Sequence, residues 1–154
     1  MRLKLISVGK MKAPALRDTV EDYLSRLRRS YEVEWTELRK EEGRQAVAEL
    51  QKREGARVLE ATRNGYLVLL DEHGKMVTSK ELAAKLEAWL QQGVKEINFA
   101  IGGPYGHGEE LRKKAQWVWS LSPLTFPHQL VPLLLAEQLY RAHTILKGEP
   151  YHNE

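Results

Sequence analysis

The chain has 154 residues, of which 42% are hydrophobic and 29% charged, a balance typical of a globular protein rather than a disordered one. It contains no cysteine, which excludes disulfides, a thiol nucleophile and cysteine-ligated metal clusters. No apolar run approaches the roughly 20 residues of a membrane span, and the first ten residues lack the apolar segment of a signal peptide. We therefore expect a cytoplasmic protein with no membrane partner, in which residues 1–154 form a single domain.

The formal net charge of +3 is unevenly spread along the chain. Residues 1–65 hold 15 Lys and Arg against 11 Asp and Glu, whereas residues 66–154 hold 9 against 10. In the basic half, Arg26, Arg28 and Arg29 come shortly after Lys10 and Lys12. Such a group can attract a phosphate backbone, but a solvated helix face is the commoner explanation. Charge alone therefore indicates no function.

The first half of the chain alternates strand and helix patterns. Pro14 suits the start of a helix, because the first turn needs no N–H there. The wholly apolar run Tyr66–Leu70 is typical of a strand covered on both faces, and we expect the polar segment Asp71–Val77 to be a loop. In chain order, the patterns predict a strand over Arg2–Val8, a helix over Pro14–Leu27, a strand over Tyr31–Leu38, a helix over Arg44–Ala61 and a strand over Tyr66–Leu70.

The second half continues the alternation. Thr78 stands three residues before Glu81, the spacing of a capping box, which predicts a helix to Leu90. Later segments are predicted as a strand over Ile97–Ile101, a glycine-rich turn over Gly102–Gly108, a helix over Glu109–Gln116, an apolar stretch over Trp117–Leu121, a loop over Ser122–Pro127 and a helix over Gln129–Lys147. Strands that alternate with helices indicate an α/β domain whose mostly parallel sheet lies between helix layers.

Three strand ends are candidates for a ligand site, because ligands of open α/β sheets bind at the carboxyl ends of strands. They are Leu70-Asp71, Ile101–Pro104 and Leu121–Phe126. The middle segment matches neither the phosphate-loop nor the dinucleotide pattern. It is either a tight turn that needs positive φ or a loop that contacts a ligand. Apolar walls beside open backbone groups suit a flat uncharged ring such as adenine better than a pyrophosphate.

The predicted last helix brings titratable side chains together. Glu137 and Arg141 form an i,i+4 pair next to Tyr140. Such pairs are commonly weak surface salt bridges, but the neighbouring run Leu133–Ala136 indicates that much of this helix is buried. The five histidines show no metal-ligand spacing, so we expect no metal site, and His73 is expected to be an ordinary surface residue.

Six motifs occur in order along the chain: Met1–Gly9, Val68–Asp71, Ile101–Gly106, Trp119–His128, Ala136–Ala142 and Pro150–His152. Together they resemble the RlmH-type SPOUT methyltransferases over the whole length of the chain. The resemblance implies an enzyme that uses S-adenosylmethionine to methylate N3 of a pseudouridine in 23S ribosomal RNA of the ribosome, with no DNA partner. It also implies a C-terminal trefoil knot, which general topology rules would not suggest. A homodimer is implied as well, with a tail that crosses to the other subunit.

The resemblance also assigns roles to residues. Glu137 and His152 are candidates for handling the N3 proton. Arg141 is suited to orienting Glu137, holding a phosphate or stabilising the deprotonated ring. Tyr151 and His128 are suited to stacking on the RNA or bonding to it. The methyl donor is assigned to Leu70, Gly102, Gly103, Leu121, Ser122, Pro123, Leu124, Thr125 and Phe126.

The tail departs from the family in one position and keeps a second interpretation open. Family members usually carry Arg or Lys where this chain has Asn153. If that cation touches a phosphate or the target base, this chain lacks one charge-assisted contact, and either Arg141 or the basic N-terminal half compensates or the affinity for the ribosome is lower. Asn153 slightly favours a non-catalytic dimer that binds RNA or the ribosome, whereas the presence of Glu137, Arg141 and His152 counts against it. A third interpretation, a nucleotide-binding oxidoreductase, is weakened by the missing glycine fingerprint.

Overall fold

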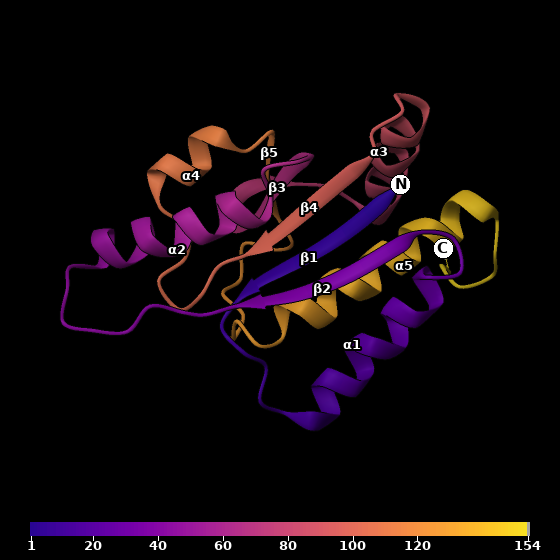
Figure 1. Ribbon diagram of the computed structural model, residues 1–154. Coiled ribbons are helices and arrows are strands. Elements are labelled where there is room, and N and C mark those ends of the chain that lie inside the picture. Colours follow the sequence, from indigo (N-terminus) through magenta and orange to yellow (C-terminus); the bar gives the residue numbers. More distant parts are fainter. Residues whose placement is uncertain (154) are drawn as a thin grey trace.

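The computed structural model describes residues 1–153 and shows strands and helices that alternate along the chain (Figure 1). Neighbouring strands are all parallel, in the order β2-β1-β4-β3-β5. This arrangement confirms the predicted α/β class. The elements are β1 (Arg2–Val8), α1 (Pro14–Leu27), β2 (Glu32–Leu38), α2 (Val47–Ala61), β3 (Tyr66–Met76), α3 (Ser79–Gln91), β4 (Glu96–Ile101), α4 (Glu109–Lys114), β5 (Trp117–Ser120) and α5 (Val131–Lys147).

Helices cover both faces of the sheet, and each face has its own apolar core. On one face, side chains of α1, α3 and α5 pack with the strand residues Leu3, Leu5 and Phe99. On the other face, α2 and α4 pack against Leu69 and Ala100. The central strands bury both faces, which explains their nearly continuous apolar sequence. Among residues 1–153, no helix is long and apolar enough to cross a membrane.

Strand β3 is longer than its sequence pattern predicts. It continues beyond Leu70 to Met76, so the loop expected over Asp71–Val77 is wrong for most of its length. The register against β5 shifts between Leu70 and Lys75, which leaves the intervening residues out of the ladder. Gly74 lets the two strands approach closely, because a Cβ there would meet the carbonyl oxygen of Val118 at 2.6 Å. A bulge rich in polar residues resembles a loop in sequence.

The other differences lie at the ends of elements. Strand β2 begins at Glu32 and β4 at Glu96, each one residue from its predicted start, and helix α2 begins at Val47 rather than at Arg44. Helix α4 ends two residues earlier than predicted, and α5 begins at Val131. The Thr78–Glu81 capping box is present at the start of α3, and α5 ends at Lys147 as predicted, with Gly148 at φ +68° after it.

The parallel topology decides where loops can gather. The carboxyl ends of parallel strands lie at one edge of the sheet, so the segments that follow β1, β2, β4 and β5 all leave from that edge (Figure 1). The bulge of β3, which follows Leu70, lies next to them because Leu70 pairs with Ile101 and Trp119. We call this edge the carboxyl edge.

Candidate functional site

A cavity of about 520 Å³ opens at the carboxyl edge, within the range of small-molecule sites. The bulge of β3, the glycine-rich turn after β4 and the segment after β5 form its walls. The three strand ends singled out in the sequence therefore meet around one cavity. Of the nine residues assigned to the methyl donor, eight line this cavity: Leu70, Gly102, Gly103, Leu121, Ser122, Leu124, Thr125 and Phe126. The ninth, Pro123, does not line it.

The glycine-rich turn has the geometry of a tight turn, and it also forms one wall of the cavity. Gly106 has φ +71° and donates its N–H to the carbonyl oxygen of Gly103 at 3.0 Å. A Cβ on Gly102 would lie 3.1 Å from the carbonyl carbon of Gly106. A Cβ on Gly103 would lie 3.3 Å from Cγ1 of Val8. Side chains at these positions would therefore crowd the turn.

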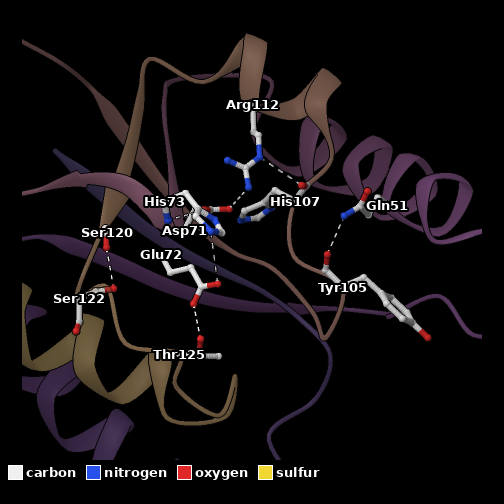
Figure 2. A network of polar contacts seen from close by, with 10 residues as sticks. All are labelled: Gln51, Asp71, Glu72, His73, Tyr105, His107, Arg112, Ser120, Ser122 and Thr125. Carbon is white, nitrogen blue, oxygen red and sulfur yellow. Dashed lines mark hydrogen bonds and ion pairs between the residues drawn. The ribbon is translucent and has the colours of Figure 1, made fainter.

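A buried ion pair supports this turn from behind (Figure 2). The guanidinium of Arg112 donates to Asp71, whose side chain is 8% exposed. His107 is buried beside them, and its Nε2–H donates to the carbonyl oxygen of Ala100 at 3.2 Å. Burial lowers the pKa of His107, so its imidazole is neutral at physiological pH. Sequence reasoning missed Arg112, since no local pattern links it to a carboxylate 41 positions away.

Hydrogen bonds also tie the cavity loops to one another. The hydroxyl of Thr125 donates to Glu72 at 2.7 Å, which joins the segment after β5 to the bulge of β3. The side-chain amide of Gln51 donates to the carbonyl oxygen of Tyr105 at 2.7 Å and fixes the glycine-rich turn to α2 (Figure 2). His73 has a 75% exposed side chain, as expected for a surface residue, yet it lies against Asp71 and lines the cavity.

A buried carboxyl group lies behind the glycine-rich turn. Glu54, on α2, is only 3% exposed, and its Oε2 accepts the backbone N–H of Glu41 at 2.9 Å. Its Oε1 is buried with no hydrogen-bond partner, and its carboxyl lies about 3.5 Å from where a Cβ on Gly103 would be. Burial raises the pKa of Glu54. No sequence pattern indicated the burial of Glu54, since a charged residue on a charged helix ordinarily faces water.

The residues assigned to catalysis form a second cluster, on α5 and the tail after it. Oε1 of Glu137 accepts from Nε of Arg141 at 2.9 Å and from its Nη2 at 2.5 Å. The same oxygen accepts from the hydroxyl of Tyr151 at 3.1 Å. Nη1 of Arg141 lies 3.2 Å from Nδ1 of His152. The structure therefore brings these four side chains together, and we call them the α5 cluster.

The α5 cluster is partly buried, and its contacts shift the pKa of Tyr151 and of Arg141. Burial, a hydrogen bond with Tyr23 and the nearby Glu137 carboxylate raise the pKa of Tyr151. The hydrogen bonds to Glu137 raise the pKa of Arg141. The Arg141 guanidinium also lies 4.9 Å from the centre of the Tyr151 ring, a cation–π distance. Tyr151 stays a neutral phenol and Arg141 stays a cation at physiological pH.

The α5 cluster and the cavity are separate within one chain. No residue of the cluster lines the cavity, whereas Val131, the first residue of α5, does. Glu137 and Arg141 are six and ten residues further along the helix, which corresponds to roughly 9 and 15 Å at 1.5 Å per residue. Of the residues assigned to chemistry or RNA, only His128 contacts the cavity, and it also borders a smaller hollow beside Lys10.

No group of three or more His, Asp or Glu side chains within residues 1–153 is arranged to hold a metal ion.

Comparison with known proteins gives consistent matches along the chain. The profile of a family described as "Predicted SPOUT methyltransferase" matches residues 1–152. The "Ribosomal RNA large subunit methyltransferase H" of Geobacter metallireducens is 46% identical over 154 residues, covering 99% of each chain. The protein of the same name from Methylobacillus flagellatus is 40% identical over 157 residues, covering all of both chains. A solved structure of "a probable methylase family protein from Haemophilus influenzae Rd KW20" shares the fold, with a TM-score of 0.58 at 14% identity over 99% of this chain and 70% of that one.

Proposed function

Since the chain belongs to the SPOUT methyltransferase family, we propose that it transfers a methyl group from S-adenosylmethionine to N3 of a pseudouridine in 23S ribosomal RNA. The observation that carries this proposal is the meeting of three strand ends around one cavity, which has the volume of a small-molecule site and both apolar and polar walls. Relatives that match over their full length are named as methyltransferases of large-subunit ribosomal RNA. The enzyme would act in the cytoplasm, where it meets ribosomes.

The residues of the cavity fit the methyl donor. Leu70, Ile101 and Phe126 offer apolar walls for a flat ring, while Gly102 and Gly103 line the cavity in a turn that a Cβ would crowd. When bound, S-adenosylmethionine supplies a methyl group that is already activated on its sulfonium sulfur. The chain's own task is then to hold the acceptor nitrogen in line with that methyl group.

The acceptor needs more help, because a protonated imide nitrogen is a poor nucleophile. Glu137 accepts four hydrogen bonds, including one from Gln138, so its role is to fix Arg141 rather than to take the N3 proton. Arg141 donates to Nδ1 of His152, which places the proton of a neutral imidazole on Nε2. Arg141 and His152 are therefore suited to stabilising the ring oxygens as N3 loses its proton to solvent.

We infer a homodimer, because one chain keeps its α5 cluster away from its own cavity. A second copy that places its tail at this cavity would complete the site. The apolar side chains of Leu133 and Leu134 on α5 are only half-buried, which leaves a surface for such a partner. Leu124, 67% exposed at the cavity, is a second apolar contact for the partner to cover.

We also infer the trefoil knot of the family for the C-terminal half. What supports it is the course of the chain after β5. That segment turns back to share one cavity with the glycine-rich turn, rather than running outward from the sheet's edge.

The test is transfer of a labelled methyl group from S-adenosylmethionine to ribosomes that lack the modification. Ribosomes with and without the pseudouridine are compared, and the labelled nucleotide is mapped. We expect labelling at N3 that depends on the pseudouridine. Absence of labelling, from protein shown by calorimetry to bind the donor, would contradict the proposal and favour a non-catalytic RNA-binding dimer.

A further inference from the structure

Two loops at the carboxyl edge carry exposed cations that form no ion pair within the described residues 1–153. Lys10 and Lys12 follow β1, and Arg39 and Arg44 follow β2. The loops leave the sheet side by side, because Val8 pairs with Leu38 at the ends of their strands. The loop after β1 lies close to the cavity, because Lys10 borders a small hollow whose lining includes the cavity residues His128 and Gly102. The loop after β2 passes behind the glycine-rich turn, where the backbone N–H of Glu41 donates to Glu54.

The loop after β1 is held so that its lysines face water. Met11, between them, is 4% exposed, and its backbone N–H donates to Glu37 at 2.5 Å. Arg17 donates to the carbonyl oxygen of Met11 at 2.9 Å and to Glu37 at 2.6 Å. With Met11 fixed on both sides, Lys10 and Lys12 flank a buried anchor and stay exposed. A charge presented by a fixed loop costs little ordering when it binds.

The acidic groups near these loops leave the cations in excess. Four of them form ion pairs with other cations: Glu37 with Arg17, Glu41 with Arg57, Glu42 with Lys40 and Asp71 with Arg112. Within residues 1–153, three exposed acids at this edge have no Lys or Arg partner: Asp18 in α1, Glu72 in the bulge of β3 and Glu109 at the start of α4. Four exposed cations therefore outnumber three exposed carboxylates, and only Asp18 of the three lies on α1, the element that follows Lys10 and Lys12.

The basic group that the sequence suggested is split by the fold. Lys10 and Lys12 precede α1, whereas Arg26, Arg28 and Arg29 lie at its other end, roughly 20 Å away for 14 residues. There Arg26 pairs with Asp22, and Arg28 pairs with Glu21. The partnered arginines therefore lie far from the cavity, while the free cations lie beside it.

An exposed aromatic ring stands at the same edge. Tyr105 is 41% exposed although it lines the cavity, and its backbone is held by Gln51. Figure 2 shows its ring directed away from Asp71 and Glu72. Proteins that bind unpaired RNA commonly stack bases on such rings, next to cations that contact phosphates.

We propose that Lys10, Lys12, Arg39, Arg44 and Tyr105 form an RNA-docking surface that leads the target strand into the cavity. The cations contact phosphates near the target nucleotide, and Tyr105 stacks on an unpaired base beside it. An exposed aromatic ring at the same edge as the cations favours RNA over an acidic protein. This inference rests on the proposed function. It assigns the binding of the RNA substrate to a surface that lies outside both the cavity and the α5 cluster.

The test compares two double variants that remove equal charge. Lys10→Gln/Lys12→Gln lies on the proposed surface, and Arg29→Gln/Lys95→Gln replaces two exposed cations at the opposite edge. Filter binding to unmodified ribosomes is measured across a range of salt concentrations. We expect the first variant to bind about tenfold more weakly, with a salt slope shallower by about 0.7 to 0.9 per lost phosphate contact. The second variant should bind like wild type, and both should bind S-adenosylmethionine normally.

The proposed stacking of an RNA base on Tyr105 is tested with two further variants. Tyr105→Ala should weaken ribosome binding by about tenfold or more, whereas Tyr105→Phe should keep most of the affinity, because stacking needs the ring and not the hydroxyl. Wild-type binding by Lys10→Gln/Lys12→Gln, or equal losses in both double variants, would overturn the docking surface. The assay measures ribosome binding and not methyl transfer. If the wild type failed to transfer methyl groups, the proposed function would be contradicted, but the binding results for the docking surface would still stand.

Discussion

The cavity and the α5 cluster differ in the kinds of residues that form them. The cavity is walled by apolar side chains such as Leu70 and Phe126, by polar side chains of the β3 bulge, and by a turn in which a Cβ on Gly102 or Gly103 would crowd its neighbours. The α5 cluster is a network of charged and phenolic side chains in which each group is bonded to the next. The first is a hollow with mixed walls, and the second holds a cation among its hydrogen-bond partners.

The difference indicates what each region contributes to a methyl transfer. An activated donor needs to be oriented, which backbone geometry and apolar walls can do. An acceptor that must lose a proton needs charge placed nearby, which only side chains such as Arg141 supply. Because one chain holds these regions roughly 9 to 15 Å apart along α5, the comparison also predicts that they meet across two chains. Variants in each region should therefore give separable defects.

The largest effect is expected in the α5 cluster. Arg141→Ala should lower kcat for methyl transfer by about 100-fold or more, because the cation that stabilises the deprotonated ring is lost. Arg141→Lys should recover part of the rate, since it keeps the charge but not the paired N–H groups that hold Glu137. Calorimetry should show unchanged affinity for S-adenosylmethionine. Weaker donor binding in Arg141→Ala would erase the distinction between the two regions.

A smaller defect is expected from a change in the cavity, and it should appear in donor binding rather than in kcat. Gly102→Ala places a Cβ about 3.1 Å from the backbone of Gly106, so the turn must open at a cost of about 1–3 kcal/mol. We expect roughly tenfold weaker binding of S-adenosylmethionine, measured by calorimetry. Gly55→Ala is the matched control, because a Cβ there meets only Leu111 at 3.7 Å. In helix α2 it should stabilise the fold and leave donor binding intact.

The smallest effect concerns the buried carboxyl behind the turn. Burial raises the pKa of Glu54 above its ordinary value of 4.5. The folded state therefore holds this proton more tightly than the unfolded state, and stability falls as pH rises from below 4.5 through the folded-state pKa. Glu54→Gln removes that dependence.

Thermal unfolding as a function of pH checks this effect. At pH 7 we expect Glu54→Gln to melt about 2–4 °C higher than wild type, with the gap closing below about pH 4. A gap that is constant across pH would show that Glu54 is not the titrating group. Unchanged donor affinity would show that the carboxyl supports the fold of the turn and not the ligand.

Sequence patterns anticipated the regions whose signals are local. The buried strands, the Thr78–Glu81 cap and the three strand ends around the cavity each follow from short-range spacing or from parallel topology. The i,i+4 pair of Glu137 and Arg141 is equally local. These features need no knowledge of distant partners.

The features that sequence reasoning missed depend on contacts between distant segments. Asp71 pairs with Arg112, which is 41 positions away. The bulge of β3 forms because β3 leaves its ladder with β5 after Leu70 and pairs with it again from Lys75. Glu54 lies on a charged helix, yet it is buried behind the glycine-rich turn. The basic residues of the first half look like one group in sequence, yet α1 carries Lys12 and Arg26 to opposite edges of the sheet.

The central claim is that the cavity of one chain works with the α5 cluster of another. A heterodimer of Gly102→Val and Arg141→Ala chains, isolated with two different affinity tags, tests it directly. If the site is shared, one of its two sites combines an intact cavity with an intact cluster, and methyl transfer should reach about half of the wild-type rate. If each chain builds its own site, neither is intact. A heterodimer no more active than its two parent homodimers, or failure of the chains to pair at all, would contradict the account.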